Sequence, residues 1–255
     1  MYIPLTTRKV TIMKKSLSTL CILGPCILGC FAQSALAANN INLANFTGPA
    51  AQSDFRILSE DLGSALSYKS VTPAAPLGIT GIDMGLEATS TKMRNLDTAT
   101  NSSLNDLITP RLYITKGLPL NIDVGAFYSA VPTTNIKLYG GELRYAILEG
   151  SATQPAIGIR GALTKLSGVN QLDLNTKSLD VSISKGFAMF TPYAGVGSVW
   201  VNSNPNGIPG LANESFRQNK VFAGGNLNLG FTNLALEYDK TGYAPSYSAK
   251  LGFRF

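Results

Sequence analysis

The sequence predicts an all-β fold, a transmembrane antiparallel β-barrel of about ten strands with a short N-terminal helix. Three observations lead to this prediction. Short segments that alternate apolar and polar residues recur from residue 81 to the end of the chain, and a side-chain period of two is typical of strands with two different faces. The connections between these segments alternate between short and long. Only 14% of the 255 residues are charged, which is sparse for a polar face that meets bulk water.

Ten segments carry the alternation. They are residues 82–89, 111–115, 122–129, 136–148, 157–164, 171–185, 193–201, 220–229, 234–239 and 247–255. A tilted strand needs about 9–11 residues to cross a membrane, and the second and ninth segments are shorter than this. The apolar parity changes around Gly140-Gly141 and again near residues 176–178, and these changes predict two β-bulges.

The connections support a membrane orientation. Residues 92–109 and 202–219 form long connections, whereas 117–120, 149–155, 186–192 and 231–233 are short. Barrels of the bacterial outer membrane have short periplasmic turns and longer outer loops. With an even number of strands, the final residue Phe255 is expected at the periplasmic rim.

The polar parity of the strands carries charges of both signs, which predicts an ion-pair network in a narrow lumen. The predicted network contains Asp83, Glu87, Arg111, Glu142, Arg144, Arg160, Glu237, Asp239, Lys250 and Arg254. Two carboxylate pairs on single strand faces, Asp83 with Glu87 and Glu237 with Asp239, leave a catalytic dyad open as an alternative. The chain has no histidine, so the usual activated-serine route is closed. We expect no enzymatic activity, no catalytic residues, no cofactor and no metal site.

Residues 1–37 predict a signal peptide. A cationic start is followed by a short apolar run and by Ala35-Leu36-Ala37, a small-x-small cleavage site. Met13 is a plausible true start, and Cys30 follows a lipobox-like stretch, which leaves lipidation open. Four of the 21 Lys and Arg residues and none of the 15 Asp and Glu residues lie in this segment. The remaining chain therefore has a net charge of only +2, and we expect no nucleic-acid partner.

Residues 38–80 form a leader with a helix and an extended linker. Ser53 is expected to cap a helix over residues 54–66, with Phe55, Leu58, Leu62, Ala65 and Leu66 on one face. Glu60 and Asp61 are exposed in this interpretation. The helix either plugs the lumen, lies on the periplasmic rim, or remains a solvated leader; we favour the first two positions.

Several stretches together resemble a family of proteobacterial outer-membrane β-barrel proteins of unknown function. They are residues 59–63, 76–81, 117–120, 140–149 and 248–255. The resemblance extends over the barrel, residues 81–255, and the leader. It implies the fold and the outer-membrane location but no ligand residues. The last strand is also similar to the C-terminal signal read by the barrel-assembly machinery, which would contact Tyr247, Leu251, Phe253 and Phe255.

These observations leave three hypotheses for function. The first is a monomeric, non-enzymatic barrel with a structural or surface-interaction role, whose partners are outer-membrane lipid and, during biogenesis, the assembly machinery. The second is a narrow channel or transporter for small or apolar solutes, gated by the N-terminal segment. The third is a soluble secreted β-protein, whose apolar parity would face inward.

Overall fold

The computed structural model describes residues 41–94, 106–131 and 134–255. The predicted signal peptide, with Met13 and Cys30, lies outside these residues. The described chain begins with a short 3-10 helix, η1 (Leu43–Asn45), and one α-helix, α2 (Ala51–Leu66). No helix in the described part of the chain is both long and apolar enough to cross a membrane.

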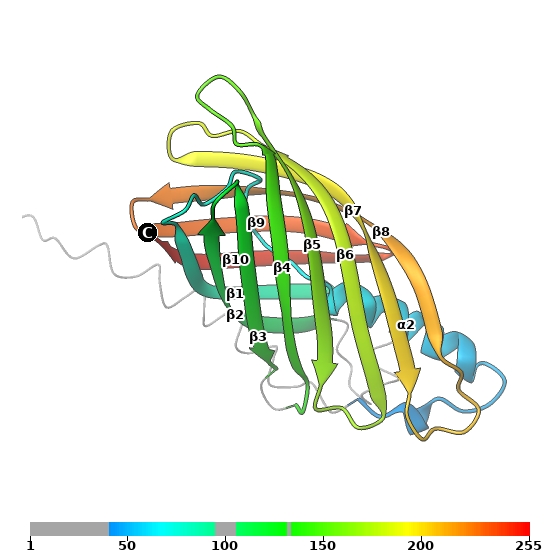
Figure 1. Ribbon diagram of the computed structural model, residues 1–255. Helices are drawn as coiled ribbons and strands as arrows, with labels where there is room; N and C mark the ends of the chain where they lie inside the picture. Colours follow the sequence, from blue (N-terminus) through cyan, green and yellow to red (C-terminus); the bar gives the residue numbers. More distant parts are fainter. Residues whose placement is uncertain (1–40, 95–105, 132–133) are drawn as a thin grey trace, which may run out of the picture.

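Ten antiparallel strands follow and close into one barrel, in which β1 pairs with β10 (Figure 1). They are β1 (Ile82–Lys92), β2 (Asp106–Leu118), β3 (Ile122–Ala130), β4 (Lys137–Leu148), β5 (Ala156–Ser167), β6 (Leu172–Ser184), β7 (Phe190–Pro205), β8 (Glu214–Leu229), β9 (Thr232–Thr241) and β10 (Ala244–Arg254). The predicted fold class and strand number are confirmed.

The two faces of the barrel wall have inverted chemistry. Apolar side chains point outward and are exposed, such as Leu112 and Leu163 at 60% and Leu236 at 69%. Charged side chains such as Asp123 and Asp180 point inward and are buried. A soluble barrel would bury its apolar face, so this arrangement excludes the soluble alternative and is typical of a barrel surrounded by lipid.

Several predicted strand boundaries were wrong. The second and ninth strands are longer than predicted, with 13 and 10 residues. Pro110 lies inside β2, opposite Ala88, although proline lacks the amide donor of a regular ladder. Strands β7 and β8 have 16 residues each, so only residues 206–213 remain as their connection.

Both predicted bulges were also wrong. Gly140 and Gly141 pair in continuous register with β3 and β5, and β6 pairs without interruption past residues 176–178. The register shift in β4 lies instead between Ala146 and Leu148. The changes in apolar parity have another cause. Leu138, Leu172 and Leu174 point inward and are buried in the apolar cluster that contains α2.

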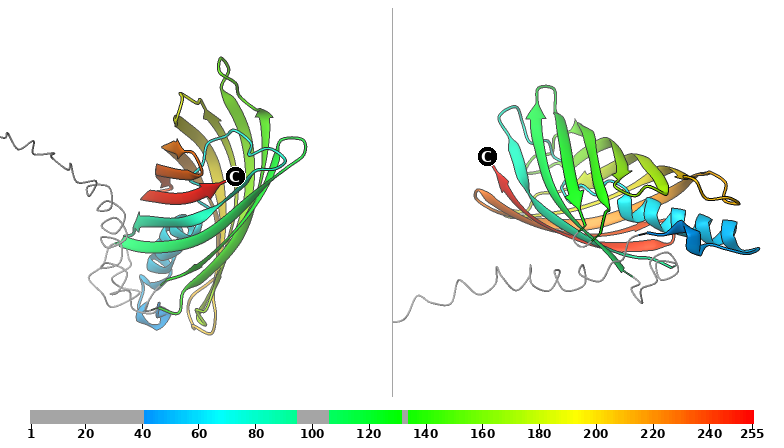
Figure 2. Two further views of the ribbon diagram at one scale, coloured as in Figure 1. Left: turned by 90° about the vertical axis from the view of Figure 1, so that its left-hand side faces the viewer. Right: turned by 90° about the horizontal axis from the view of Figure 1, so that it is seen from below.

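Helix α2 lies at the barrel end opposite the C-terminus (Figures 1 and 2). This end, where β1 finishes and β2 begins, is called the mouth below; the other end is the terminal end. The helix begins three residues earlier than predicted and Ala50 provides no side-chain cap. Ser53 donates instead to the Ala50 carbonyl. Of the two favoured positions, the rim near Phe255 was therefore wrong.

A plugged lumen as the candidate functional site

Helix α2 enters the barrel with its second half. Every residue from 61 to 74 is buried, whereas residues 51–54 are at least partly exposed. The predicted apolar face, Phe55 to Leu66, is buried against the inner wall at the mouth. Residues 51–77, which comprise α2 and the extended stretch behind it, are called the plug below.

Close contacts hold α2 against β7. Ser59 Oγ donates a hydrogen bond to Ser203 Oγ at 2.9 Å. A Cβ added at Gly63 would lie 2.6 Å from Val201 Cγ2, a separation that real side chains do not reach. The absence of a side chain at Gly63 therefore lets the helix backbone approach the wall.

Ion pairs between charged side chains hold α2 in place at the mouth. Arg94, just beyond β1, donates from Nη2 to Asp61 Oδ1 at 2.8 Å and to Glu60 Oε2 at 3.0 Å. Asp61 is 1% exposed, which corrects the prediction that it meets solvent. Arg56 pairs with Glu214 at 2.6 Å. Partial burial lowers the pKa of Arg94, but its hydrogen bonds to the two carboxylates outweigh this effect and raise it.

The extended part of the plug runs along the lumen from the end of α2. Lys69 lies 2.7 Å from Asp239 Oδ1 on β9, and both side chains are almost fully buried. Arg111 donates to the carbonyl of Ser67 at 3.1 Å, and Lys220 donates to that of Tyr68 at 3.0 Å. Wall cations thus satisfy backbone carbonyls that have no secondary-structure partner.

The same pattern continues toward the terminal end. Arg144 donates to the Pro73 carbonyl at 2.8 Å and also pairs with Asp123. Asp123 in turn accepts from the Leu77 amide at 3.1 Å. The plug is therefore bonded to the wall at successive depths of the lumen.

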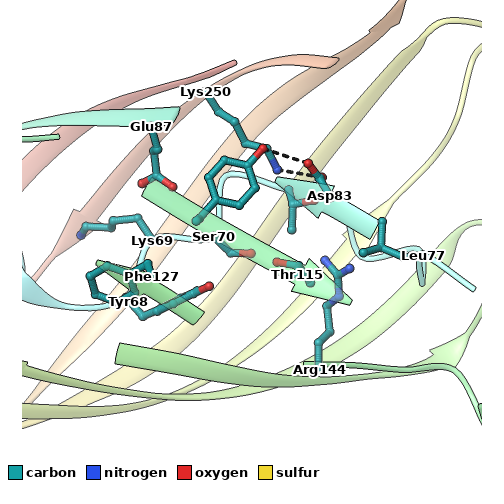
Figure 3. Close-up of a pocket in the computed structure, with 12 residues that line it drawn as sticks. Tyr68, Lys69, Ser70, Leu77, Asp83, Glu87, Thr115, Phe127, Arg144 and Lys250 are labelled. Carbon is teal, nitrogen blue, oxygen red and sulfur yellow. Dashed lines mark hydrogen bonds and ion pairs between the residues drawn. The ribbon is translucent and has the colours of Figure 1, made fainter. Parts of the chain in front are cut away.

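Little free space remains beside the plug. The pocket in Figure 3 has a cavity of about 10 Å³ between the plug and strands β1, β2, β3, β4 and β10. A cavity needs roughly 10–15 Å³ to hold one water molecule. At this level the described residues fill the bore.

The ten residues of the predicted charge network all lie on the inner wall. Nine are buried, and the side chain of Arg254 is 27% exposed at the terminal end. Asp83 on β1 accepts from Lys250 and Arg254 on β10 at 3.1 and 2.6 Å, so this cluster joins the two strands that close the barrel. Arg160 pairs with Asp180 at 2.9 Å.

The other predicted network members are distributed around the wall. The Arg111 and Glu87 side chains approach to 3.5 Å, and those of Arg160 and Glu142 to 3.9 Å. Glu237 makes no ion pair among the described residues. Because the inward charged side chains face one another and the plug, they fill the lumen and do not line an open cavity. No group of three potential metal ligands occurs in the described ranges.

The predicted network lacked Lys69, Asp123, Asp180 and Lys220. Asp123, Asp180 and Lys220 occupy the inward parity of β3, β6 and β8, so the alternation could have identified them. Lys69 lies in a linker without periodicity, and no sequence signal places it beside Asp239. The sequence did contain one signal for the plug: Leu138 and Leu172 place apolar side chains on the inward parity, where α2 packs against them.

The inverted wall, the closed strand order and the polar lumen define a transmembrane β-barrel of the bacterial outer-membrane class, and the outer membrane is its location. The four residues predicted as an assembly signal, Tyr247, Leu251, Phe253 and Phe255, all point outward and are 37–65% exposed. Whether the assembly machinery reads them stays a prediction.

Comparisons with known proteins find similarity only among solved structures. No protein-family model and no curated protein matches the chain. The N-terminal β-barrel domain of Pseudomonas aeruginosa OprF is similar over 70% of this chain and 99% of its own, with 14% identity and a TM-score of 0.36. The KdgM porin in complex with disordered oligogalacturonate is similar over 69% of this chain and 99% of its own, with 7% identity and a TM-score of 0.38. Ail of Yersinia pestis is similar over 69% of this chain and 97% of its own, with 13% identity and a TM-score of 0.28. These likenesses concern the fold alone.

Proposed function

We propose that the chain is a monomeric, non-enzymatic outer-membrane barrel whose N-terminal segment seals the bore and is displayed at the cell surface, where it serves a structural or interaction role. The observation that carries this proposal is the unbroken burial of residues 61–74 inside the barrel. A bore filled by its own chain is unsuited to general diffusion. The chain also lacks histidine, which is consistent with a non-catalytic role.

The proposed orientation follows from the connections. The two longest connections, residues 93–105 and 206–213, both lie at the mouth, whereas the longest at the terminal end is 149–155. Long loops face outward in this class of barrel. The mouth, and with it the N-terminal half of α2, therefore faces the cell exterior.

An epitope inserted at Gly48, in the exposed turn before α2, tests this orientation. We expect antibody to label the epitope on intact cells, because this turn lies at the mouth. The matched control is the same epitope at Gly150, in the exposed β4–β5 turn at the terminal end, which should be labelled only after the outer membrane is permeabilised. Labelling with the opposite preference would contradict the proposal.

A second candidate function is a narrow channel that opens when the plug moves. One observation favours it. Val71, buried in the plug, has a φ of 45°, and a β-branched residue in this left-handed region stores strain of about 1–3 kcal/mol. Release of the plug would relieve that strain. The conductance experiment in the Discussion separates the two candidates.

A further inference from the structure

The lipid-facing wall of the described strands has a hollow that the plug does not explain. It is a groove of about 390 Å³ across β4, β5 and β6. Tyr139, Leu163, Lys165 and Lys177 line it together with Gly141. The groove lies on the outer surface, so its occupant comes from the membrane and not from the lumen.

The groove exists because a side chain is missing from the outward row of β4. Gly141 lies on this row between Tyr139 and Leu143, and a Cβ placed on it would meet only the Gly125 carbonyl within 4 Å. On β5, Gly161 also faces outward and has nothing within 4 Å of an added Cβ. Gly161 is the diagonal neighbour of Gly141 and lies just outside the groove, whereas the exposed Tyr139 and Leu163 side chains lie beside Gly141 within it. The dimensions and apolar walls of the groove suit an acyl chain.

Two lysines line the groove: Lys165 lies beside Tyr139 in register, and Lys177 lies beside Leu163. Lys165 pairs in register with Asn175, so Lys177, two residues further along β6, is its diagonal neighbour. Diagonal neighbours on one face of a sheet are roughly 7–8 Å apart, which lets both flexible side chains reach one anion. Both lysines are exposed, and neither makes an ion pair or hydrogen bond among the described residues.

The position of these lysines matches a wider charge asymmetry. In the described strands, the outward cations of the mouth half are Lys92, Lys137, Lys165, Lys177, Arg217 and Lys240. Outward acids of the same half are fewer, Asp106 and Asp173. At the terminal end, Lys116 and Lys185 are instead bonded to backbone carbonyls. Except for Arg217, which donates to Ser198 Oγ, these mouth-half cations make no ion pair or hydrogen bond among the described residues, and anionic headgroups of that leaflet would neutralise them.

We propose that this groove is a binding site for a phosphorylated lipid of the leaflet at the mouth. One acyl chain lies on Gly141, beside Tyr139 and Leu163. Lys165 and Lys177 bind the headgroup phosphate. Charge complementarity favours this occupant over an apolar face of another protein, because a protein helix would leave the two ammonium groups without partners.

The experiment uses the folded full-length mature protein in detergent and native mass spectrometry. The probe is a six-chain, doubly phosphorylated glucosamine disaccharide lipid, compared with its dephosphorylated form and with inorganic phosphate. We expect one tightly bound phosphorylated lipid and no comparable binding of either control. Each lysine near an anionic lipid contributes about fivefold to affinity, so K165Q/K177Q should weaken binding roughly thirtyfold.

Two variants make the result specific. K165R/K177R keeps both charges and should retain the bound lipid. K92Q/K240Q removes two outward cations on β1 and β9, away from the groove, and should bind as the unsubstituted chain does. The proposal is overturned if K165Q/K177Q binds undiminished, if the dephosphorylated lipid binds equally well, or if K92Q/K240Q loses as much. A lipid-free dimer abolished by K165Q/K177Q would also overturn it, by assigning the groove to a second copy.

Discussion

Deletion of residues 41–77 is expected to convert a silent barrel into a conducting one. The plug fills the lumen at successive depths, from Ser59 beside Ser203 to Leu77 beside Asp123. Once the plug is removed, water can enter the bore and hydrate the inward charges of the wall, and this hydration stabilises the open barrel. Planar-bilayer recording should show no steps with the intact protein and discrete steps with the deletion variant.

A shorter deletion provides the matched control. Removal of residues 41–66 takes away α2 but leaves residues 67–77, which fill the middle of the barrel; its steps should be smaller than those of the full deletion. Heat-modifiable gel mobility establishes that each variant is folded. Should the full deletion fail to fold, a protease site at Ile79, which is 65% exposed, allows the plug to be cut and washed out after folding. A folded, plug-free barrel that stays silent would contradict the assignment of the plug as the seal.

Replacement of Lys69 by methionine is expected to destabilise the protein by about 3–5 kcal/mol, the usual cost of leaving one member of a buried ion pair without its partner. The Asp239 side chain is 1% exposed and would keep only the hydrogen bond from Thr241 at 2.8 Å. Guanidinium unfolding in detergent micelles, followed by the fluorescence of the single tryptophan, Trp200, measures the change.

Two controls separate the buried pair from charge loss in general. R56Q removes a cation whose side chain is 40% exposed, and such surface pairs contribute only about 0–1 kcal/mol. The double variant K69M/D239L removes both buried charges and should recover much of the stability lost by K69M alone. A K69M protein within 1 kcal/mol of the unsubstituted chain would show that Lys69 is not held at Asp239.

The barrel wall was predictable because its chemistry is local. Each strand repeats the same alternation, so inward residues such as Arg111 and Glu142 were identifiable from parity alone. The apolar face of α2 was readable for the same reason. Local patterns do not indicate which residues from distant segments meet. Nothing near Asp61 in sequence indicates its pairing with Arg94.

The two predicted bulges were wrong, but the changes in apolar parity that suggested them were real. Leu138, Leu172 and Leu174 are apolar residues on the inward parity, which a water-filled lumen would not favour. A parity change can therefore mean that the strand is irregular or that something apolar packs against it. Only the contacts of α2 with the mouth decide between the two, and several of those contacts join residues far apart in the sequence, such as Ser59 and Ser203.

The most direct test of the plugged lumen is a disulfide between α2 and β7. Ser59 and Ser203 have their Oγ atoms 2.9 Å apart, and the chain's own cysteines are confined to positions 21, 26 and 30. In S59C/S203C protein taken from outer membranes, mass spectrometry of proteolytic peptides should find the two cysteines joined in nearly all molecules. Recovery of both cysteines as free, alkylated thiols would contradict a helix seated in the barrel mouth.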